Sequence, residues 1–171
     1  MTFTTHSLDY GLTEGRSILP YQPAHDVFLR LYGHYAYKFF FESKDVSPIY
    51  GRFNLMGVDP ALRLRGKNSG FEIEALNERG LFYLKAFQDQ DFQPYESLKR
   101  SKNKISGVIR RSQEVSEESE RSKQHNIAVG IRVFLKRFSL KTKSFLGLYG
   151  AFSYDFVRQF ETLPSLLPDN E

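Results

Sequence analysis

The chain has 171 residues, of which 40% are hydrophobic, with 16 Phe and 10 Tyr among them. A domain of this length buries about two-thirds of the surface of its unfolded chain, so the residues for an aromatic core are present. The absence of cysteine excludes disulfides, thiolate nucleophiles and zinc–thiolate sites. The net charge of +4, from 24 basic and 20 acidic residues, is mild for a protein that binds nucleic acid.

Targeting signals are not visible in the sequence. The first residues contain no basic segment followed by an apolar run, so they do not predict a signal peptide. No apolar run approaches the roughly 20 residues that cross a bilayer. These patterns predict a cytoplasmic protein that binds neither membranes nor nucleic acid.

The first predicted elements lie in the N-terminal part. Residues 1–24 are polar and turn-rich, and they predict an extended lead-in with room for one strand. The stretch "AHDVFLRLYGH" predicts a short helix, with Asp26 as its N-cap and Gly33 at its C-terminal end. The aromatic run "YAYKFFFES" predicts a strand. Because this run is apolar on both faces at its centre, we expect an inner strand of a sheet.

Two strand pairs are predicted next. The stretch "PIYGRFNLMGVDPALRLRG" predicts two short strands around the turn Gly57–Pro60. The stretch "GFEIEALNERGLFYLKAF" predicts a hairpin, in which "NERG" is the turn, Gly80 supplies a positive φ and "LFYLKAF" is the returning strand. Glu72 and Glu74 alternate with apolar residues and follow Arg63 and Arg65, which predicts a solvated cross-strand charge pattern rather than a catalytic pair of carboxylates.

Residues 96–126 are rich in Ser, Lys, Arg and Glu and contain no aromatic residue, which predicts a polar linker. One interpretation is an arm that binds nucleic acid or a protein partner. The other is an exposed insertion between packed elements. The second is favoured, because acidic residues are interspersed with the basic ones and no side chain is available to stack on bases.

The C-terminal part predicts a helix or strand, then a strand, then a helix. In "NIAVGIRVFLKRF" the apolar residues fit a helical stripe and a strand alternation equally well. Asn126 as a cap and the basic residues at the end of the stretch favour the helix. "FLGLYGAFSYD" predicts a strand in which Gly147 and Gly150 allow close backbone approach. "DFVRQFETLP" predicts a helix with Asp155 near its N-terminus.

No catalytic or metal-binding pattern is recognisable. The four histidines, His6, His25, His34 and His125, lack the spacing of metal ligands. The Gly147 and Gly150 pair lacks the third glycine and the downstream acid of a dinucleotide-binding fingerprint. No nucleophile with a base, and no cofactor motif, is found. The residues therefore predict a β-rich scaffold with no catalytic residues of its own.

Three segments in order resemble the N-terminal region of anthranilate synthase component I, a chorismate-utilising enzyme. They are "FFFESKDVSPIYGRFNLMGVDPALRLRG", "FEIEALNERGLFYL" and "GLYGAFSYDFVRQFETLP". The second is most similar to the form fused to a glutamine amidotransferase. The resemblance covers residues 25–168 and implies that residues 25–171 are an incomplete N-terminal domain. It implies an α+β fold, the N-terminal part of a layered antiparallel β-sandwich with helices.

The resemblance also implies an activity for the complete enzyme. Chorismate and an ammonia source give anthranilate and pyruvate, the first step of tryptophan synthesis, with Mg²⁺ bound to the carboxylate of the substrate. The family's chorismate and Mg²⁺ ligands lie in a C-terminal half that nothing in this chain matches. We therefore expect a truncated or split portion that is inactive alone. Its expected partners are a chain that carries the catalytic half and a glutamine amidotransferase.

One binding role of the family falls within this sequence. The feedback inhibitor L-tryptophan binds partly against the family's Glu-Ser segment, which here is Glu42 and Ser43 after Phe41. A carboxylate and a hydroxyl at the end of an aromatic strand could meet an ammonium and an indole. Here Phe39–Phe41 replaces the usual leucines, which could reshape the pocket. In the alternative, slightly favoured for the chain alone, Ser43 only ends the strand and caps a turn.

Two other functions remain open. The first is a non-enzymatic interaction module, since unpaired sheet edges invite pairing with another chain. The second is the same portion of a related enzyme: an aminodeoxychorismate, isochorismate or phenazine-pathway synthase. The Glu-Ser segment and the "EALNERG" stretch favour the anthranilate branch.

Overall fold

The computed structural model describes residues 3–8, 11–43, 53–110, 125–138 and 147–161. Within these residues, antiparallel strands form one four-stranded sheet and two two-stranded sheets, accompanied by short helices. The predicted α+β class is confirmed.

The N-terminal segment forms a hairpin rather than a lead-in with one strand. Strands β1 (Phe3–Leu8) and β2 (Leu12–Ser17) pair antiparallel along their whole length. Gly11 has a φ of 69°, a left-handed conformation that glycine adopts without steric cost. Polar strands of this kind lack the apolar alternation by which strands are recognised in a sequence.

Helix α1 (Ala24–Tyr32) forms where it was predicted, and Gly33 lies at its C-cap. Its N-cap is Pro23, whose side chain cannot accept a capping hydrogen bond, and Asp26 lies within the first turn. The prediction of Asp26 as the N-cap was therefore wrong. At its observed position the carboxylate faces the positive end of the helix dipole.

Strands β3 (Lys38–Phe41) and β4 (Leu55–Val58) pair antiparallel in a two-stranded sheet. Among the described strands β3 pairs with β4 alone, so the prediction of an inner strand was wrong. The aromatic residues of β3 contact side chains instead of flanking strands. Phe28 of α1 stacks on Phe40 with ring centroids 5.2 Å apart, and this contact covers one face of β3.

The four-stranded sheet has the order β5-β6-β8-β7, with β5 (Leu62–Lys67), β6 (Gly70–Ala75), β7 (Tyr95–Arg100) and β8 (Lys104–Ile109). Each neighbouring pair is antiparallel. The predicted strands at 62–67 and 70–75 are confirmed, but they pair with each other across a short turn, and β6 does not pair with residues 81–87.

The prediction of a polar linker over 96–126 was wrong for residues 96–109. These residues form β7 and β8, which complete the four-stranded sheet. Ile105 and Ile109 are each 1% exposed. The stretch is polar because only one side of each strand faces the core, while the other carries Lys and Ser. Residues 111–124 of the predicted linker lie outside the described residues.

The predicted hairpin turn at "NERG" is the beginning of a helix, α2 (Glu78–Leu84). The side chain of Asn77 caps it by accepting a hydrogen bond from the backbone N–H of Gly80 at 3.0 Å. Gly80 therefore has no positive φ but lies inside the helix. The 3₁₀ helix η2 (Asp89–Phe92) follows and leads into β7.

The stretch "NIAVGIRVFLKRF", which fitted a helix and a strand equally well, contains a helix, α4 (Ala128–Arg137). The N-cap is Ile127 and not the predicted Asn126, whose side chain accepts a hydrogen bond from the Ala128 N–H at 2.9 Å. The predicted strand near Gly147 is absent from residues 147–153, which are irregular. The predicted terminal helix is a 3₁₀ helix, η3 (Tyr154–Gln159), with Asp155 in its first turn.

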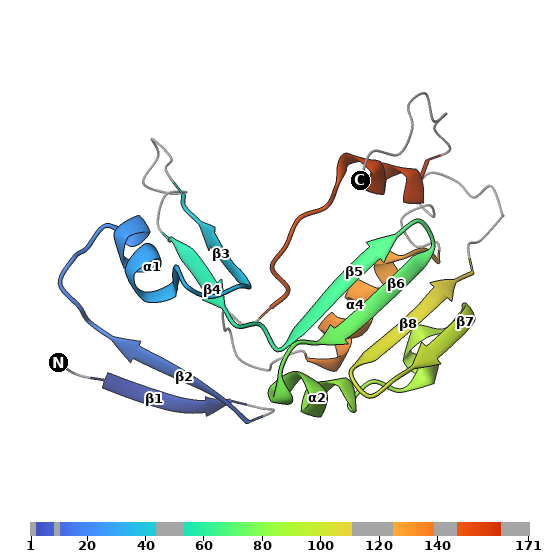
Figure 1. The fold of residues 1–171 in the computed structure, drawn as a ribbon, viewed down its shortest axis with the longest axis horizontal. Coiled ribbons are helices and arrows are strands. Elements are labelled where there is room, and N and C mark those ends of the chain that lie inside the picture. The colour runs from blue at the N-terminus through green and yellow to red at the C-terminus, as the bar shows by residue number, and fades with distance from the viewer. Residues whose placement is uncertain (1–2, 9–10, 44–52, 111–124, 139–146, 162–171) are drawn as a thin grey trace.

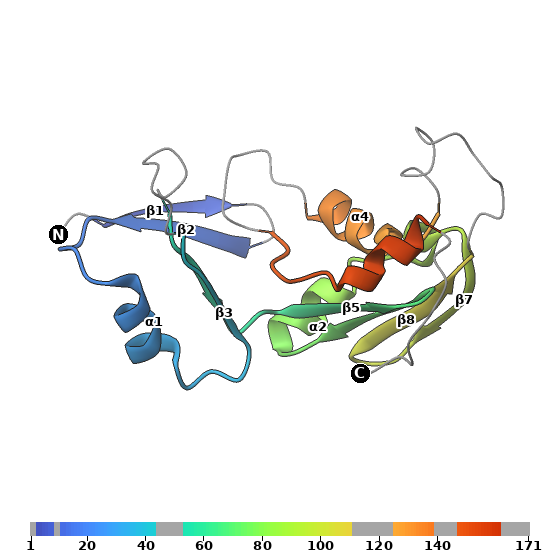
Figure 2. The same cartoon turned by 90° about the horizontal axis from the view of Figure 1, so that it is seen from above.

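The core lies on one side of the four-stranded sheet, under α2, η2 and α4 (Figures 1 and 2). It is built largely of aromatic and β-branched side chains, as the composition predicted. Its buried residues are Phe71, Ile73, Ala75, Leu84, Phe87, Phe92, Ile105, Ile109, Ile127, Val129, Val133 and Phe134. Sheet β3–β4 and helix α1 lie away from this core along the long axis of the molecule (Figure 1). Within the described residues, no helix is both long and apolar enough to cross a membrane.

Candidate functional site

The candidate site begins at the end of β3. This strand ends at Phe41, and Glu42 and Ser43 follow it directly. Both residues are exposed. The strand is held at its other end, where the Lys38 ammonium donates a hydrogen bond to the Gly33 carbonyl oxygen. The structure therefore presents a carboxylate and a hydroxyl at the end of an aromatic strand.

A second segment, far away in the sequence, meets the same strand. The ring of Tyr149 stacks on that of Phe39, with centroids 4.7 Å apart. The Phe39 ring also contacts the ring of Phe41 at 5.2 Å. Phe41 is 47% exposed and Tyr149 is 38% exposed, so these rings still offer apolar surface, and Phe41 directly precedes Glu42 in the chain. We refer to Phe39, Phe41 and Tyr149 as the aromatic cluster.

Gly57 of β4 makes room for this cluster. It is the register partner of Phe39, and a Cβ atom built on Gly57 would lie 2.2 Å from the Phe39 ring. The absence of a side chain lets the ring lie across the neighbouring strand. Two of the segments that were singled out in the sequence, the Glu-Ser stretch and the glycine–aromatic stretch, are thus brought together.

A polar cluster lies where β3–β4 meets the four-stranded sheet. Arg63 of β5 pairs with Glu74 of β6, its cross-strand neighbour, as the charge alternation predicted. The hydrogen bond from Arg63 lowers the pKa of the Glu74 carboxyl, and the same bond raises the pKa of the guanidinium. The other acidic side chain, Glu72, pairs with Lys104 of β8 at 3.0 Å. These carboxylates neutralise neighbouring cations, which is a structural role.

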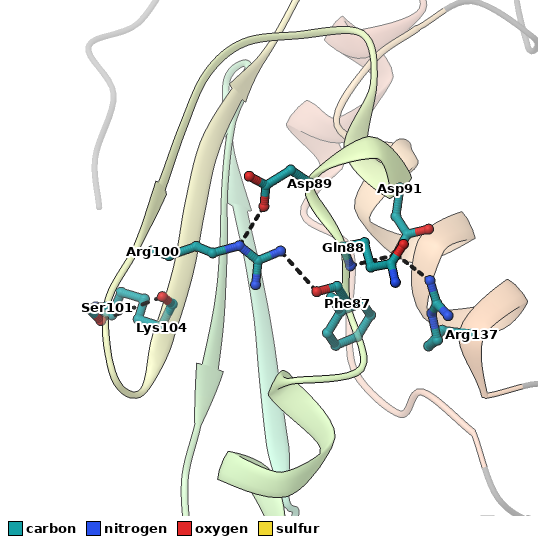
Figure 3. Close-up of polar contacts among 8 residues, drawn as sticks. All are labelled: Phe87, Gln88, Asp89, Asp91, Arg100, Ser101, Lys104 and Arg137. Carbon is teal, nitrogen blue, oxygen red and sulfur yellow. Dashed lines mark hydrogen bonds and ion pairs between the residues drawn. The ribbon is translucent and has the colours of Figure 1, made fainter.

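A third set of polar contacts holds η2 in place (Figure 3). Arg100 of β7 donates to the Asp89 carboxylate at 2.5 Å and to the Phe87 carbonyl oxygen at 2.9 Å. Asp91 accepts from the backbone N–H of Gln88 at 2.8 Å and pairs with Arg137 of α4. These bonds connect η2 to a strand on one side and to a helix on the other.

The pKa of the Asp91 carboxyl lies below its usual range. Partial burial by itself raises this pKa, but the Gln88 N–H and the Arg137 guanidinium favour the carboxylate and outweigh the burial. Because every one of these partners is structural, the perturbed pKa indicates a fixed ion pair and not an acid–base catalyst.

We expect Asp91→Asn to lower the free energy of unfolding by about 1–3 kcal/mol near neutral pH. A carboxylate whose pKa is depressed in the folded state stabilises that state above its unfolded pKa, and loses this effect as pH falls through the folded pKa. The difference between the two proteins should therefore shrink below about pH 4. Urea unfolding of both proteins at several pH values measures this difference in the free energy of unfolding. Asp155→Asn is the control, since Asp155 pairs with Arg158 at the surface with its side chain 64% exposed. A difference that stays constant with pH would contradict the prediction.

Among the described residues, no three side chains of His, Asp or Glu come together in a group that could hold a metal ion. His25 contacts the Phe40 ring and His34 contacts the Tyr35 ring, so each takes part in an aromatic contact.

The sequence did not predict the aromatic cluster as a unit. Phe39 was expected inside a sheet and Tyr149 inside a strand, whereas each contributes an accessible ring. Gly57, which faces Phe39, was the sequence feature that could have indicated this cluster, since a glycine within a strand often marks a place where another group approaches closely. Tyr37 and Asp59, which contact Arg63 and Arg79, were also missed.

One comparison with known proteins gave a relative. The chain is 31% identical, over 126 residues, to the anthranilate synthase of Azospirillum brasilense. The matched region is 71% of this chain and 17% of that relative. The similarity supports a relationship to anthranilate synthases, of which the chain would span a small part. No protein-family profile matches the chain, and no solved structure matches it.

Proposed function

We propose that the chain is a regulatory portion of an anthranilate synthase, the enzyme that makes anthranilate and pyruvate from chorismate and ammonia. The observation that carries the proposal is the similarity over 126 residues to an enzyme of that name. The chain spans 17% of this relative. In our proposal, chorismate turnover therefore depends on a catalytic half that binds Mg²⁺ and lies outside these 171 residues, together with a glutamine amidotransferase as the ammonia source.

The end of β3 is the proposed site for the inhibitor L-tryptophan. The Glu42 carboxylate would accept hydrogen bonds from the ammonium group, and the Ser43 hydroxyl would contact the amino-acid backbone of the ligand. The exposed faces of Phe41 and Tyr149 would pack against the indole, since aromatic rings associate by offset stacking or edge-to-face contact. In this proposal the charged group and the apolar surface bind the two ends of one aromatic amino acid.

A direct binding measurement tests this site. The chain contains no Trp, so the fluorescence of added L-tryptophan is the only indole signal. We expect the anisotropy of that fluorescence to rise as protein is added. Glu42→Gln removes a charge-assisted hydrogen bond worth about 1.5–3 kcal/mol, which corresponds to a Kd about 10- to 100-fold higher. Ser43→Ala should have a smaller effect, since its hydrogen bond is neutral.

The same dipeptide elsewhere in the chain gives a matched control. Glu96 and Ser97 of β7 are exposed and lie on a different sheet. Glu96→Gln and Ser97→Ala should leave the Kd unchanged. The tryptophan site is refuted if the parent chain does not bind L-tryptophan, or if the control variants weaken binding as much as Glu42→Gln. Anthranilate formation by the purified chain from chorismate and ammonia would refute the need for a partner.

An interaction module is the second candidate. Among the described strands, β3 and β4 pair only with each other, which leaves a free edge on each side of a short aromatic sheet. Free edges accept a strand from another chain. Sedimentation of the chain as a monomer, with and without an extract of its source, would count against this function.

The related chorismate enzymes are separated by their product. Anthranilate, aminodeoxychorismate and isochorismate differ chemically, so reconstitution with a catalytic partner identifies the branch. The named relative favours anthranilate.

A further inference from the structure

The junction between sheet β3–β4 and the four-stranded sheet contains an uncommon backbone conformation. The chain passes from β4 to β5 through Asp59, Pro60 and Ala61. Asp59 has a φ of 46°, in the left-handed region that residues other than glycine rarely adopt. Such backbone persists only where surrounding contacts hold it, and it is common at switches.

Tyr37, just before β3, contacts this junction in two ways. Its carbonyl oxygen accepts a hydrogen bond from the Asp59 N–H at 3.1 Å. Its ring lies under the Arg63 guanidinium, with Cζ 5.2 Å from the ring centroid, and its hydroxyl accepts from Arg63 at 3.1 Å. Because Arg63 is paired with Glu74, Tyr37 is connected to both β5 and β6.

The Asp59 side chain makes a second connection. Its carboxylate accepts from Arg79 at 2.6 Å and from the Asn77 amide at 3.2 Å. Arg79 lies in α2 and Asn77 caps that helix, so this connection joins the junction to α2. The two connections thus run to different elements of the same half of the molecule.

Apolar burial does little to fix sheet β3–β4. Within the described part of residues 11–58, Phe28 is the one side chain that is buried. Among the described contacts, the polar contacts of Tyr37 and Asp59 and the stacking of Phe39 against Tyr149 contribute to the orientation of β3–β4 and α1. Polar contacts of this size are individually modest.

The arrangement of Tyr37 and Arg63 seen in the structure also has an unfavourable feature. The Nε atom of Arg63 is buried and has no hydrogen-bond partner among the described residues. An unsatisfied buried donor is unfavourable, and water would reach it if the Tyr37 ring moved away. A rearrangement that exposed this donor to water would therefore recover part of that free energy.

We propose that Tyr37 and Asp59 form a latch, which holds sheet β3–β4 and α1 in one orientation on the four-stranded sheet. When the latch opens, this unit turns about residues 59–61 while the four-stranded sheet and its core stay intact. The end of β3, with Glu42 and Ser43, moves with it. The latch goes beyond the proposed function, because it does not depend on which ligand the end of β3 binds.

Spin labels on the full-length chain test the latch. The protein has no cysteine, so Asn54→Cys and Lys102→Cys place one label beside β4 and one in the β7–β8 turn. We expect a narrow distribution of distances between the labels in the parent. Tyr37→Ala should broaden it. Tyr21→Ala is the matched control, since Tyr21 is 93% exposed, and it should leave the distribution narrow.

Hydrogen exchange separates a latch from a general loss of stability. In Tyr37→Ala, amide exchange should become about tenfold faster in β3 and β4 and stay unchanged in β6 and β8. Tyr37→Phe keeps the ring and loses only the hydroxyl, so it should give a smaller effect in the same strands and remain folded. An unchanged distance distribution in Tyr37→Ala would overturn the proposal. So would exchange that rises equally in β6 and β8.

Discussion

Replacing Phe92 with alanine is expected to lower the free energy of unfolding by about 3–5 kcal/mol. Phe92 is 0% exposed and stacks on Phe71 with ring centroids 5.0 Å apart. It also contacts the Phe87 ring at 6.0 Å. The phenyl group therefore lies between the sheet and the segment that follows α2. Its removal would leave a cavity bounded by rigid rings that cannot collapse to fill it.

Urea unfolding of parent and variant measures this effect. Phe82→Ala is the control, because Phe82 is 68% exposed on α2 and its loss should change the free energy by a few tenths of a kcal/mol. An equal loss in the two variants would show that Phe92 does not occupy the core position that the structure gives it.

Gly80→Ala is expected to lower the free energy of unfolding by about 3 kcal/mol. In an ordinary helix this change is stabilising, by about 1 kcal/mol. Here a Cβ atom on Gly80 would lie 2.0 Å from the Ala61 carbonyl oxygen and 3.0 Å from the Ala75 Cα. Both neighbours are backbone atoms, one in β6 and the other directly before β5, so relief of the clash requires α2 to move off the sheet.

Gly130→Ala in α4 is the matched control for this prediction. A Cβ atom there would lie 3.4 Å from the Leu64 side chain, at ordinary contact distance. Its free energy of unfolding should stay the same or rise by up to about 1 kcal/mol. If Gly80→Ala stabilises the protein as Gly130→Ala does, then α2 does not lie against β5 and β6 as closely as the structure indicates.

Several elements were predictable because their pattern is local. Strands β5 and β6 show the alternation of a sheet with one face in the core and one in solvent, and the pairing of Arg63 with Glu74 follows from that register. Helix α1 follows from its apolar spacing. For α4, an asparagine at the helix start and a basic last turn favoured the helix over the strand, because signals at helix ends depend on a few adjacent residues.

Other features were decided by contacts between distant residues. Residues 78–84 have a turn-like sequence, yet they form a helix because Asn77 caps it and Gly80 fits against Ala61. The polar stretch at 96–109 becomes β7 and β8 because β6 offers a free edge and the core accepts Ile105 and Ile109. Strand pairing supplies backbone hydrogen bonds that cannot be predicted from the sequence pattern of one segment.

The candidate site also has some features that were predictable from the sequence and others that depend on tertiary contacts. The sequence by itself determined that a carboxylate and a hydroxyl, Glu42 and Ser43, follow an aromatic strand. Only the tertiary structure decided that Tyr149 stacks on Phe39 of that strand and that Tyr37 reaches Arg63. Phe39 and Tyr149 lie more than a hundred positions apart in the chain and meet through packing. A contact of that kind depends on the whole arrangement of strands rather than on the period of any one segment.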